Sequence, residues 1–232
     1  HPSGNPGIQI HHLDPIMDKN DLVWSITYND MISIGETINS SKYYNRKTIS
    51  VGGANIGING YLDVLRGSQI SSLFDGIDIS EYTLISGDVL SGKLIDLSSG
   101  LGHLHNSISI VNKGENNREF LGWILPGLSK PSLSRTFLSS LIPNSISNYT
   151  NNLNGSLRAI VPFGRWEKML PMNIFPDFLV KSIIAKDIDM MENLGIYECV
   201  PEDFALCSYV CQSKVEVSNI IQDGLECIEV EG

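Results

Sequence analysis

Hydrophobic and polar positions follow two different periods along the chain. In the first half, short runs of alternating apolar and polar residues end at glycine or asparagine, which is typical of half-buried strands joined by turns. Beyond Asn154-Gly155 the apolar residues recur every three or four positions, which is the spacing of amphipathic helices. The pattern therefore predicts an α+β protein in which the strands come first and the helices last.

The first forty residues are predicted to form the end of a larger α/β unit. Residues Val23–Tyr28 alternate like a half-buried strand, and residues 30–37 have the composition of a short helix. The polar cluster Asn39-Ser40-Ser41-Lys42 then marks a boundary. We therefore assign residues 1–40 to this unit.

Residues 41–97 are predicted to form a small β-grasp module. Strands are expected at Thr48–Val51, Tyr61–Val64 and Tyr82–Ile85. Ser68 is placed to cap a short helix over residues 71–74. A strand–strand–helix–strand order within so short a stretch is typical of this module.

Residues 98–153 are predicted to form a β-rich connection. Two strands, His105–Val111 and Glu119–Leu125, flank the sequence Lys113–Asn117. The glycine and asparagines of that sequence favour a hairpin loop.

Residues 154–232 are predicted to form a helical bundle. Pro176 has the favoured first position of a helix, and another helix is expected to end at Gly195. Ser213 and Glu216 have the spacing of a capping box before the last helix. The apolar face of the first of these helices is expected to contain Phe178, Leu179, Ile183 and Ile184, and that of the last Val217, Ile220, Ile221, Leu225 and Ile228.

Composition and charge narrow the class of protein. The 232 residues are 42% hydrophobic, 18% charged and carry a net charge of −10, which excludes a disordered chain and disfavours binding to nucleic acid. No stretch has the roughly 18 apolar residues of a spanning helix, so we expect no transmembrane segment. The chain opens at His1 without a methionine or a leader, which indicates a piece of a longer protein. Gly4, Pro6 and Gly7 predict a flexible start, and residues 11–15 a turn.

Two short motifs suggest a ligand-binding site. Residues Gly87–Leu94 differ from a phosphate-binding loop by lacking the final hydroxyl, so a glycine-rich turn is favoured. The pairs His11-His12 and His103/His105 suggest a metal site, but no cysteine or carboxylate has matching spacing. We therefore interpret these histidines as structural or surface residues.

The four cysteines have the most informative spacing. Cys207 and Cys211 fit the third and fourth positions of a C-x2-C-x2-C-x3-C run, which wraps an iron–sulfur cubane. Cys199 would be the first ligand, with two extra residues inserted, and Phe204 stands at the second. This leaves an incomplete ligand set.

An upstream segment has the same spacing with every cysteine replaced. Counting back from Pro171, the four positions hold Leu170, Trp166, Phe163 and Ile160. Four large apolar side chains there would fill the space that a cluster would otherwise occupy.

Several motifs, in order along the chain, resemble NqrA, the family of peripheral subunits of the Na⁺-translocating NADH:quinone reductase. They are His1–Gly7, His11–Pro15, Val23–Ile26, Ile85–Gly92, Leu101–Asn106, Phe120–Gly127, Glu202–Lys214 and Ile228–Gly232. The family also resembles RnfC and the NADH-binding flavoprotein subunit of complex I, in which a β-grasp module precedes a helical domain with iron–sulfur clusters. RnfC has two complete cysteine runs where this chain has the segments from Ile160 and Cys199. Cys199 departs from the family's pattern, which has an apolar residue there, and we interpret it as a buried thiol.

The resemblance implies both fold and function. Residues 1–40 would end a Rossmann-like domain, residues 41–97 would be SLBB-like, and residues 154–232 would form a degenerate ferredoxin domain. The complex would pass electrons from NADH through FAD, FMN, riboflavin and an iron–sulfur cluster to ubiquinone, and export Na⁺. NqrA would be peripheral, on the cytoplasmic face of the bacterial inner membrane, docked on the membrane-embedded NqrB, linked to quinone binding and without its own redox centre.

Two other functions stay open at this point. A metal or iron–sulfur electron carrier could use Cys199, Cys207 and Cys211, with Cys227 as a fourth ligand. A pure binding module could use the β-grasp unit to hold a small ligand or a partner.

Overall fold

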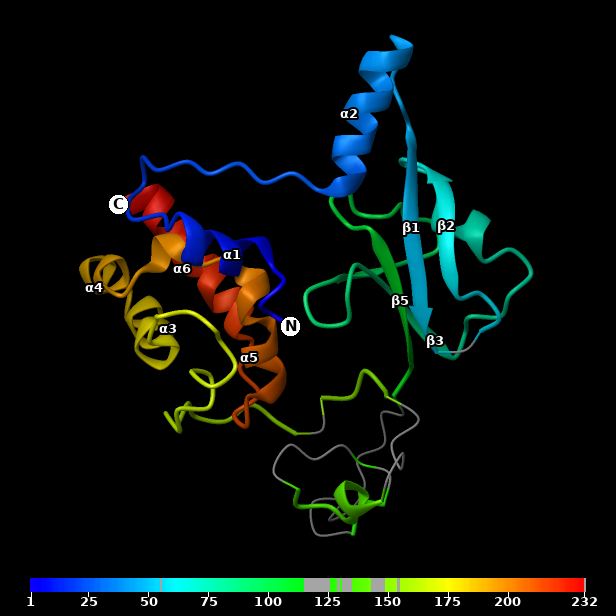
Figure 1. Cartoon of the computed structure of the whole chain (residues 1–232). Coiled ribbons are helices and arrows are strands. Elements are labelled where there is room, and N and C mark those ends of the chain that lie inside the picture. Colours follow the sequence, from blue (N-terminus) through cyan, green and yellow to red (C-terminus); the bar gives the residue numbers. More distant parts are fainter. Residues whose placement is uncertain are drawn as a thin grey trace. The chain divides into compact units, whose positions relative to one another are not determined.

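The computed structural model describes residues 1–54, 56–114, 126–128, 130, 135–142, 149–153 and 155–231. The chain folds into two compact units, which are described separately (Figure 1). The sheet unit consists of residues Ile26–Asn152, and the helical unit joins His1–Ser25 to Leu153–Gly232. The α+β class is confirmed, whereas the Rossmann-like, β-grasp and ferredoxin-like assignments and the four predicted domain ranges stay predictions.

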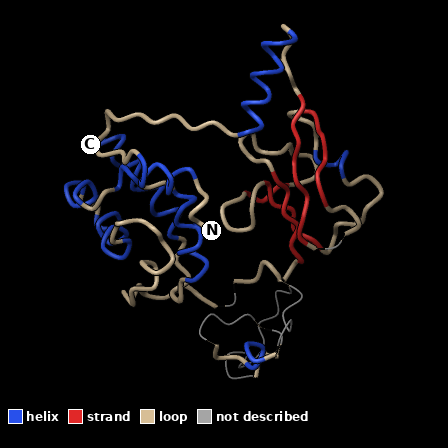
Figure 2. Tube along the Cα trace, in the orientation of Figure 1, coloured by secondary structure: helices blue, strands red, loops and turns tan. Residues whose placement is uncertain are grey.

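The sheet unit is built on five strands in the order β2-β1-β5-β3-β4 (Figure 2). Their bounds are β1 Arg46–Gly53, β2 Gly60–Leu65, β3 Tyr82–Ser86, β4 Lys93–Ile95 and β5 Ser107–Asn112. β1 and β5 are parallel, and the other three pairs are antiparallel. The predicted strands at 48–51, 61–64, 82–85 and 105–111 are therefore confirmed, with shifts of a few residues at their ends.

One face of this sheet carries the core of the unit. The alternation along β1 buries Ile49 and Val51, and that along β5 buries Ile108 and Ile110. A 3₁₀ turn, η1 Ile70–Leu73, adds the buried side chain of Ile70 to the same core. Ser68 does not cap this turn, because its hydroxyl donates to the Leu65 carbonyl instead.

The glycine-rich segment 87–92 is a turn between β3 and β4, as predicted. Gly87 has a φ of 99°, and Lys93 belongs to β4 rather than to a phosphate-binding loop. The predicted strand Glu119–Leu125 and most of the predicted hairpin loop lie outside the described residues. A second short turn, η2 Leu138–Leu141, lies further along this unit.

The segment predicted as a strand, Val23–Tyr28, does not form one. The chain is extended up to Thr27, which caps helix α2, Tyr28–Ser40, by accepting a hydrogen bond from the Asp30 amide. A strand needs a neighbour for its backbone hydrogen bonds, and the described part of the chain places none beside this segment. The predicted helix over 30–37 is confirmed, as part of the longer α2.

The helical unit packs short helices from both ends of the chain around one core. They are α1 Pro6–Leu13, α3 Pro176–Ala185, α4 Ile188–Asn193, η3 Ile196–Glu198, η4 Pro201–Phe204, α5 Ala205–Val210 and α6 Val217–Glu231. The flexible start and the turn predicted for residues 4–15 are wrong, because α1 spans most of them. No helix among the described residues has the length and apolar character needed to cross a bilayer.

Two predictions about these helices are wrong, the apolar face of α3 and the capping box before α6. α3 begins at Pro176 as expected, but it buries Leu179, Val180 and Ile183, whereas Phe178 and Ile184 are exposed. The stripe predicted for α6 is confirmed, since Val217, Ile221 and Ile228 are buried and Ile220 and Leu225 pack against the core. The capping box is wrong, because α6 begins only at Val217 and the Ser213 hydroxyl donates to the Ala159 carbonyl.

Candidate functional site

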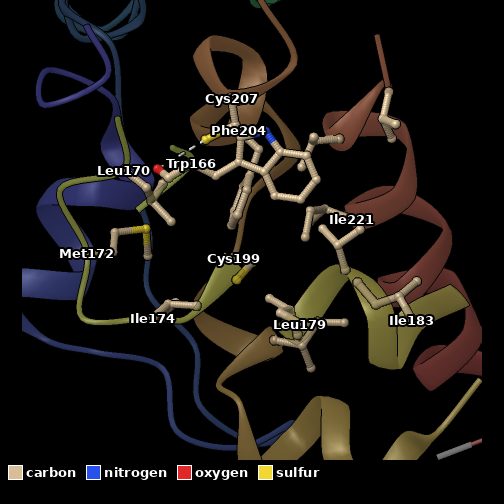
Figure 3. Packing of buried hydrophobic residues seen from close by; sticks show 14 of the residues in the cluster. Trp166, Leu170, Met172, Ile174, Leu179, Ile183, Cys199, Phe204, Cys207 and Ile221 are labelled. Atoms are coloured by element: carbon tan, nitrogen blue, oxygen red, sulfur yellow. Dashed lines mark hydrogen bonds between the residues drawn. The ribbon is translucent and has the colours of Figure 1, made fainter. Parts of the chain in front are cut away.

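The positions singled out by cysteine spacing gather in the core of the helical unit (Figure 3). Trp166 and Leu170 from the upstream run are buried there together with Cys199, Cys207 and Cys211. Ile160 is partly buried against this core. Phe163 is 65% exposed and so adds little to it.

A single carbonyl group connects the two runs. The Trp166 carbonyl accepts hydrogen bonds from the amides of Met169 and Leu170, both at 3.0 Å, which forms a tight turn. The Cys207 thiol on α5 donates to the same carbonyl at 3.7 Å, shown as the dashed line in Figure 3. The upstream run is therefore held against α5 by packing and by this weak thiol bond.

Two of the buried thiols, those of Cys199 and Cys207, are kept protonated. Burial raises the pKa of Cys207 to about 12, and the carboxyl groups of Glu167 and Asp177 add to the rise. Burial also raises the pKa of Cys199, whose thiol donates to the Gly195 carbonyl at 3.5 Å. Both thiols are therefore held as neutral groups inside the packed core.

The described residues, which include all four cysteines, contain no group of three or more His, Cys, Asp or Glu side chains placed to hold a metal ion. The alternative prediction of a carrier using Cys199, Cys207, Cys211 and Cys227 therefore lacks the ligand set that it requires. The thiols of Cys199 and Cys207 donate to two different backbone carbonyl groups, those of Gly195 and Trp166.

A small pocket opens beside this core. It is lined by Ile160, Val161, Phe163, Arg165, Trp166, Asp177, Cys211, Gln212 and Ser213. The lining residue Asp177, in the first turn of α3, is buried, and burial raises the pKa of its carboxyl group, with the charge and hydrogen bond of Glu167 as further causes. Burial and the neighbouring carboxyl group of Glu167 thus both disfavour the charged form of Asp177, while Arg165 adds a positive charge to the lining.

Three histidines of the predicted pairs, His11, His12 and His105, make hydrogen bonds with other segments. In α1, His11 Nδ1 lies 2.6 Å from Glu198 Oε2, and its Nε2 accepts from the Asn173 amide at 3.1 Å, so the proton is on Nδ1. His12 Nε2 donates to the Pro171 carbonyl at 2.9 Å. In the sheet unit, His105 Nδ1 is 2.7 Å from the Ser86 hydroxyl. Each of these rings holds segments together, as interpreted from the sequence.

Known proteins resemble the chain along its whole length. The A subunit of the Na(+)-translocating NADH-quinone reductase of Rhodopirellula baltica is 39% identical over 100% of the chain, which corresponds to 51% of that protein. The proteins of the same name from Hahella chejuensis and Neisseria meningitidis are 38% and 35% identical, again over 100% of the chain and 52% of their own length. The chain is homologous to NqrA. It spans about half the length of the curated relatives that it matches.

A family model described as the NqrA second alpha/beta domain matches residues 1–43. The matched segment contributes to both compact units, because α1 packs in the helical unit and α2 belongs to the sheet unit. The resemblance seen in the sequence motifs is thus confirmed.

A contact that sequence spacing could not reveal holds α1 in the helical unit. Asn5, just before α1, donates to the buried carboxylate of Asp203 at 2.8 Å, whose other oxygen has no hydrogen-bond partner. A Cβ atom on Gly7 would lie 2.1 Å from that oxygen, so only glycine allows this approach. The two residues are almost two hundred positions apart, and nothing local in the sequence indicates the pair.

Proposed function

We propose that the chain is part of the NqrA protein of a Na⁺-translocating NADH-quinone reductase and works there as a scaffold without a redox centre of its own. The observation that carries this proposal is the identity of 35–39% with such proteins along the entire chain. The protonated, buried thiols support the scaffold role, because they stabilise a packed core rather than a cluster.

The partners and place of this protein follow from the same proposal. The chain docks on the other subunits of the complex, above all the membrane-embedded NqrB, at the cytoplasmic face of the bacterial inner membrane. The complex uses NADH, FAD, FMN, riboflavin, an iron–sulfur cluster and ubiquinone, and none of these redox groups is held by the residues of this chain. Its net charge of −10 suits docking on protein rather than on phosphate.

Membranes of the source organism provide the first test. A tag on this polypeptide should co-purify an NADH-dependent quinone reductase activity that Na⁺ stimulates, and disrupting its gene should abolish that activity in membranes. Restoring the intact gene should restore the activity, which controls for effects on neighbouring genes. A disrupted strain that keeps full Na⁺-stimulated quinone reduction would refute the proposal.

Quinone binding is tested separately. We propose that any quinone site of the whole protein lies largely outside these 232 residues. A quinone analogue should then bind more weakly to this chain than to the longer polypeptide, as measured by fluorescence titration of both. Equal affinity of the two would place the site within this chain.

A further inference from the structure

Positive charge is concentrated in one segment of the helical unit. Residues 155–186 contain five of the 16 lysine and arginine residues of the chain but only two of its 26 aspartate and glutamate residues. Those two acids are Glu167, which is half-buried, and Asp177, which is buried. The basic residues are Arg158, Arg165, Lys168, Lys181 and Lys186. In a chain with a net charge of −10, this segment is therefore a local positive surface.

The same segment exposes large apolar side chains. Phe163 is 65% exposed and Phe178 is 62% exposed. The full set of exposed apolar side chains in the segment is Leu157, Val161, Phe163, Phe175, Phe178 and Ile184. Removing such side chains from water is favourable, so their concentration on one segment indicates an interface.

The basic and apolar side chains meet around the first turn of α3. The rings of Phe175 and Phe178 pack edge to face, with their centroids 6.4 Å apart. The charges of Lys181, one turn along α3, and of Glu167, next to Lys168, both act on Asp177. Phe163 and Arg165 line the small pocket that includes Asp177. We call the following side chains the α3 face: Phe163, Arg165, Lys168, Phe175, Phe178 and Lys181.

An anionic lipid surface fits both properties of the α3 face. Protein surfaces that lie on membranes combine aromatic or aliphatic anchors with lysine and arginine, which are attracted to acidic lipid headgroups. We propose that the α3 face binds the surface of a bilayer that contains anionic phospholipid. Phe175 and Phe178 insert at the level of the headgroups, and Lys168 and Lys181 contact lipid phosphate. This inference goes beyond the subunit role proposed above and requires no other protein of the complex.

The charges outside the α3 face limit this contact without preventing it. Exposed charges are screened over about 8 Å at physiological ionic strength, so the charges nearest the membrane dominate. Acidic residues return at Asp187 and Asp189, beyond the last turn of α3, which confines the contact to the first part of the helix. Lysine is depleted in protein interfaces, so Lys168 and Lys181 favour lipid over a protein as the occupant.

Sedimentation with vesicles tests the attraction to charge. The 232-residue chain should bind vesicles of phosphatidylcholine and phosphatidylglycerol about tenfold or more tightly than vesicles of phosphatidylcholine alone. Lys168→Gln combined with Lys181→Gln should weaken binding to the anionic vesicles about tenfold or more. The matched control is Lys42→Gln combined with Lys93→Gln, which changes two exposed lysines of the sheet unit. It has the same net charge and should bind like the wild type.

A second pair of variants tests the apolar anchor. Phe175→Ser combined with Phe178→Ser should weaken binding to the anionic vesicles about tenfold or more, because two rings no longer leave water. Leu94→Ser combined with Leu104→Ser removes two exposed side chains of the sheet unit and should not weaken it. Because all four side chains are exposed, the Tm of each variant should stay close to that of the wild type. This separates lost binding from lost folding.

The depth of insertion can be measured directly. The fluorescence of Phe178→Trp should be quenched by anionic vesicles whose acyl chains are brominated, since an anchored ring lies at the boundary between headgroups and acyl chains. Tyr61→Trp, at a position that is 82% exposed in the sheet unit, is the control and should show no quenching beyond that of the wild type.

Three outcomes would overturn the proposal. Equal binding to both kinds of vesicle, or binding to neither, would mean that the α3 face does not recognise anionic lipid. Equal losses in the sheet-unit controls would place the contact elsewhere. Binding only to membranes that keep their proteins would identify a protein as the occupant. None of these outcomes would change the subunit assignment, because the vesicles contain no other subunit.

Discussion

Asp203 carries a carboxyl group that the fold buries with only one of its oxygens hydrogen-bonded. Burial raises its pKa to about 6, the charge of Glu202 adds to the rise, and the hydrogen bond from Asn5 opposes it. The folded state therefore favours the protonated form more than the unfolded chain does. The resulting stabilisation is complete below the usual carboxyl pKa of 3.8 and is lost as the pH rises through about 6.

Replacing Asp203 by asparagine should remove this pH dependence. The variant should gain stability relative to the wild type as the pH rises. The difference between their free energies of unfolding should increase by about 1–3 kcal/mol from about pH 4 to about pH 8, which corresponds to a shift of up to roughly two pKa units. Urea unfolding at several pH values measures the difference. Asp223→Asn, an exposed carboxyl group on α6, is the control and should leave the wild-type profile in place. If the free energy of unfolding of Asp203→Asn changed with pH in parallel with that of the wild type, another group would dominate the pH dependence.

Two helical glycines illustrate what decides a substitution at the scale of an element. Gly224 lies where α6 passes close to α3, and a Cβ atom there would come within 2.8 Å of Ile183 and 2.9 Å of Ile196. Gly35 in α2 has open space around its Cα atom. Helix propensity favours alanine at both positions by about 0.5–1 kcal/mol, so packing alone separates them.

Alanine at these two positions should have opposite effects. Gly35→Ala should raise the free energy of unfolding by about 0.5–1 kcal/mol through the lower entropy of the unfolded chain. Gly224→Ala should lower it by about 1–3 kcal/mol because the core must move to admit the methyl group. Chemical denaturation monitored by circular dichroism measures both. Equal stabilisation by the two substitutions would mean that α6 packs less closely than the structure shows.

At the scale of the whole molecule, the helical unit is assembled from the two ends of the chain. Ile8 of α1 is buried in its core, and His11 and His12 bond to Glu198 and to the Pro171 carbonyl. These contacts connect segments that lie far apart in the sequence, so α1 is held by tertiary packing rather than by its own propensity.

Cleavage of the chain between α1 and α2 should not release α1 from the helical unit. A protease site inserted after the exposed Asn20 should allow complete cleavage, while the N-terminal peptide stays with the rest of the chain on gel filtration. Ile8→Asp places an unpaired charge in the core and should release the peptide after the same cleavage. Loss of the peptide from the cleaved wild type would contradict the packing of α1.

The elements that the sequence predicts correctly are those with a strong local period. β1, β2 and β3, the start of α3 at Pro176 and the stripe of α6 all follow from alternation, helical spacing or proline placement. The failures share a different cause. Val23–Tyr28 has the period of a strand but lacks a partner, and α1 has a weak helical signal but is stabilised by the core.

Sequence alone determined the α+β class, the order of strands before helices and the relationship to NqrA, because periodicity and motifs are written along the chain. It also singled out Trp166, Leu170 and the cysteines, whose spacing gives an incomplete ligand set for a cluster. Only the tertiary structure shows that the thiols of Cys199 and Cys207 are buried, kept protonated and donate to the backbone carbonyl groups of Gly195 and Trp166. It alone brought Asp203 to α1 and turned Phe178 of α3 outward, because such contacts depend on which distant surfaces are available to pack.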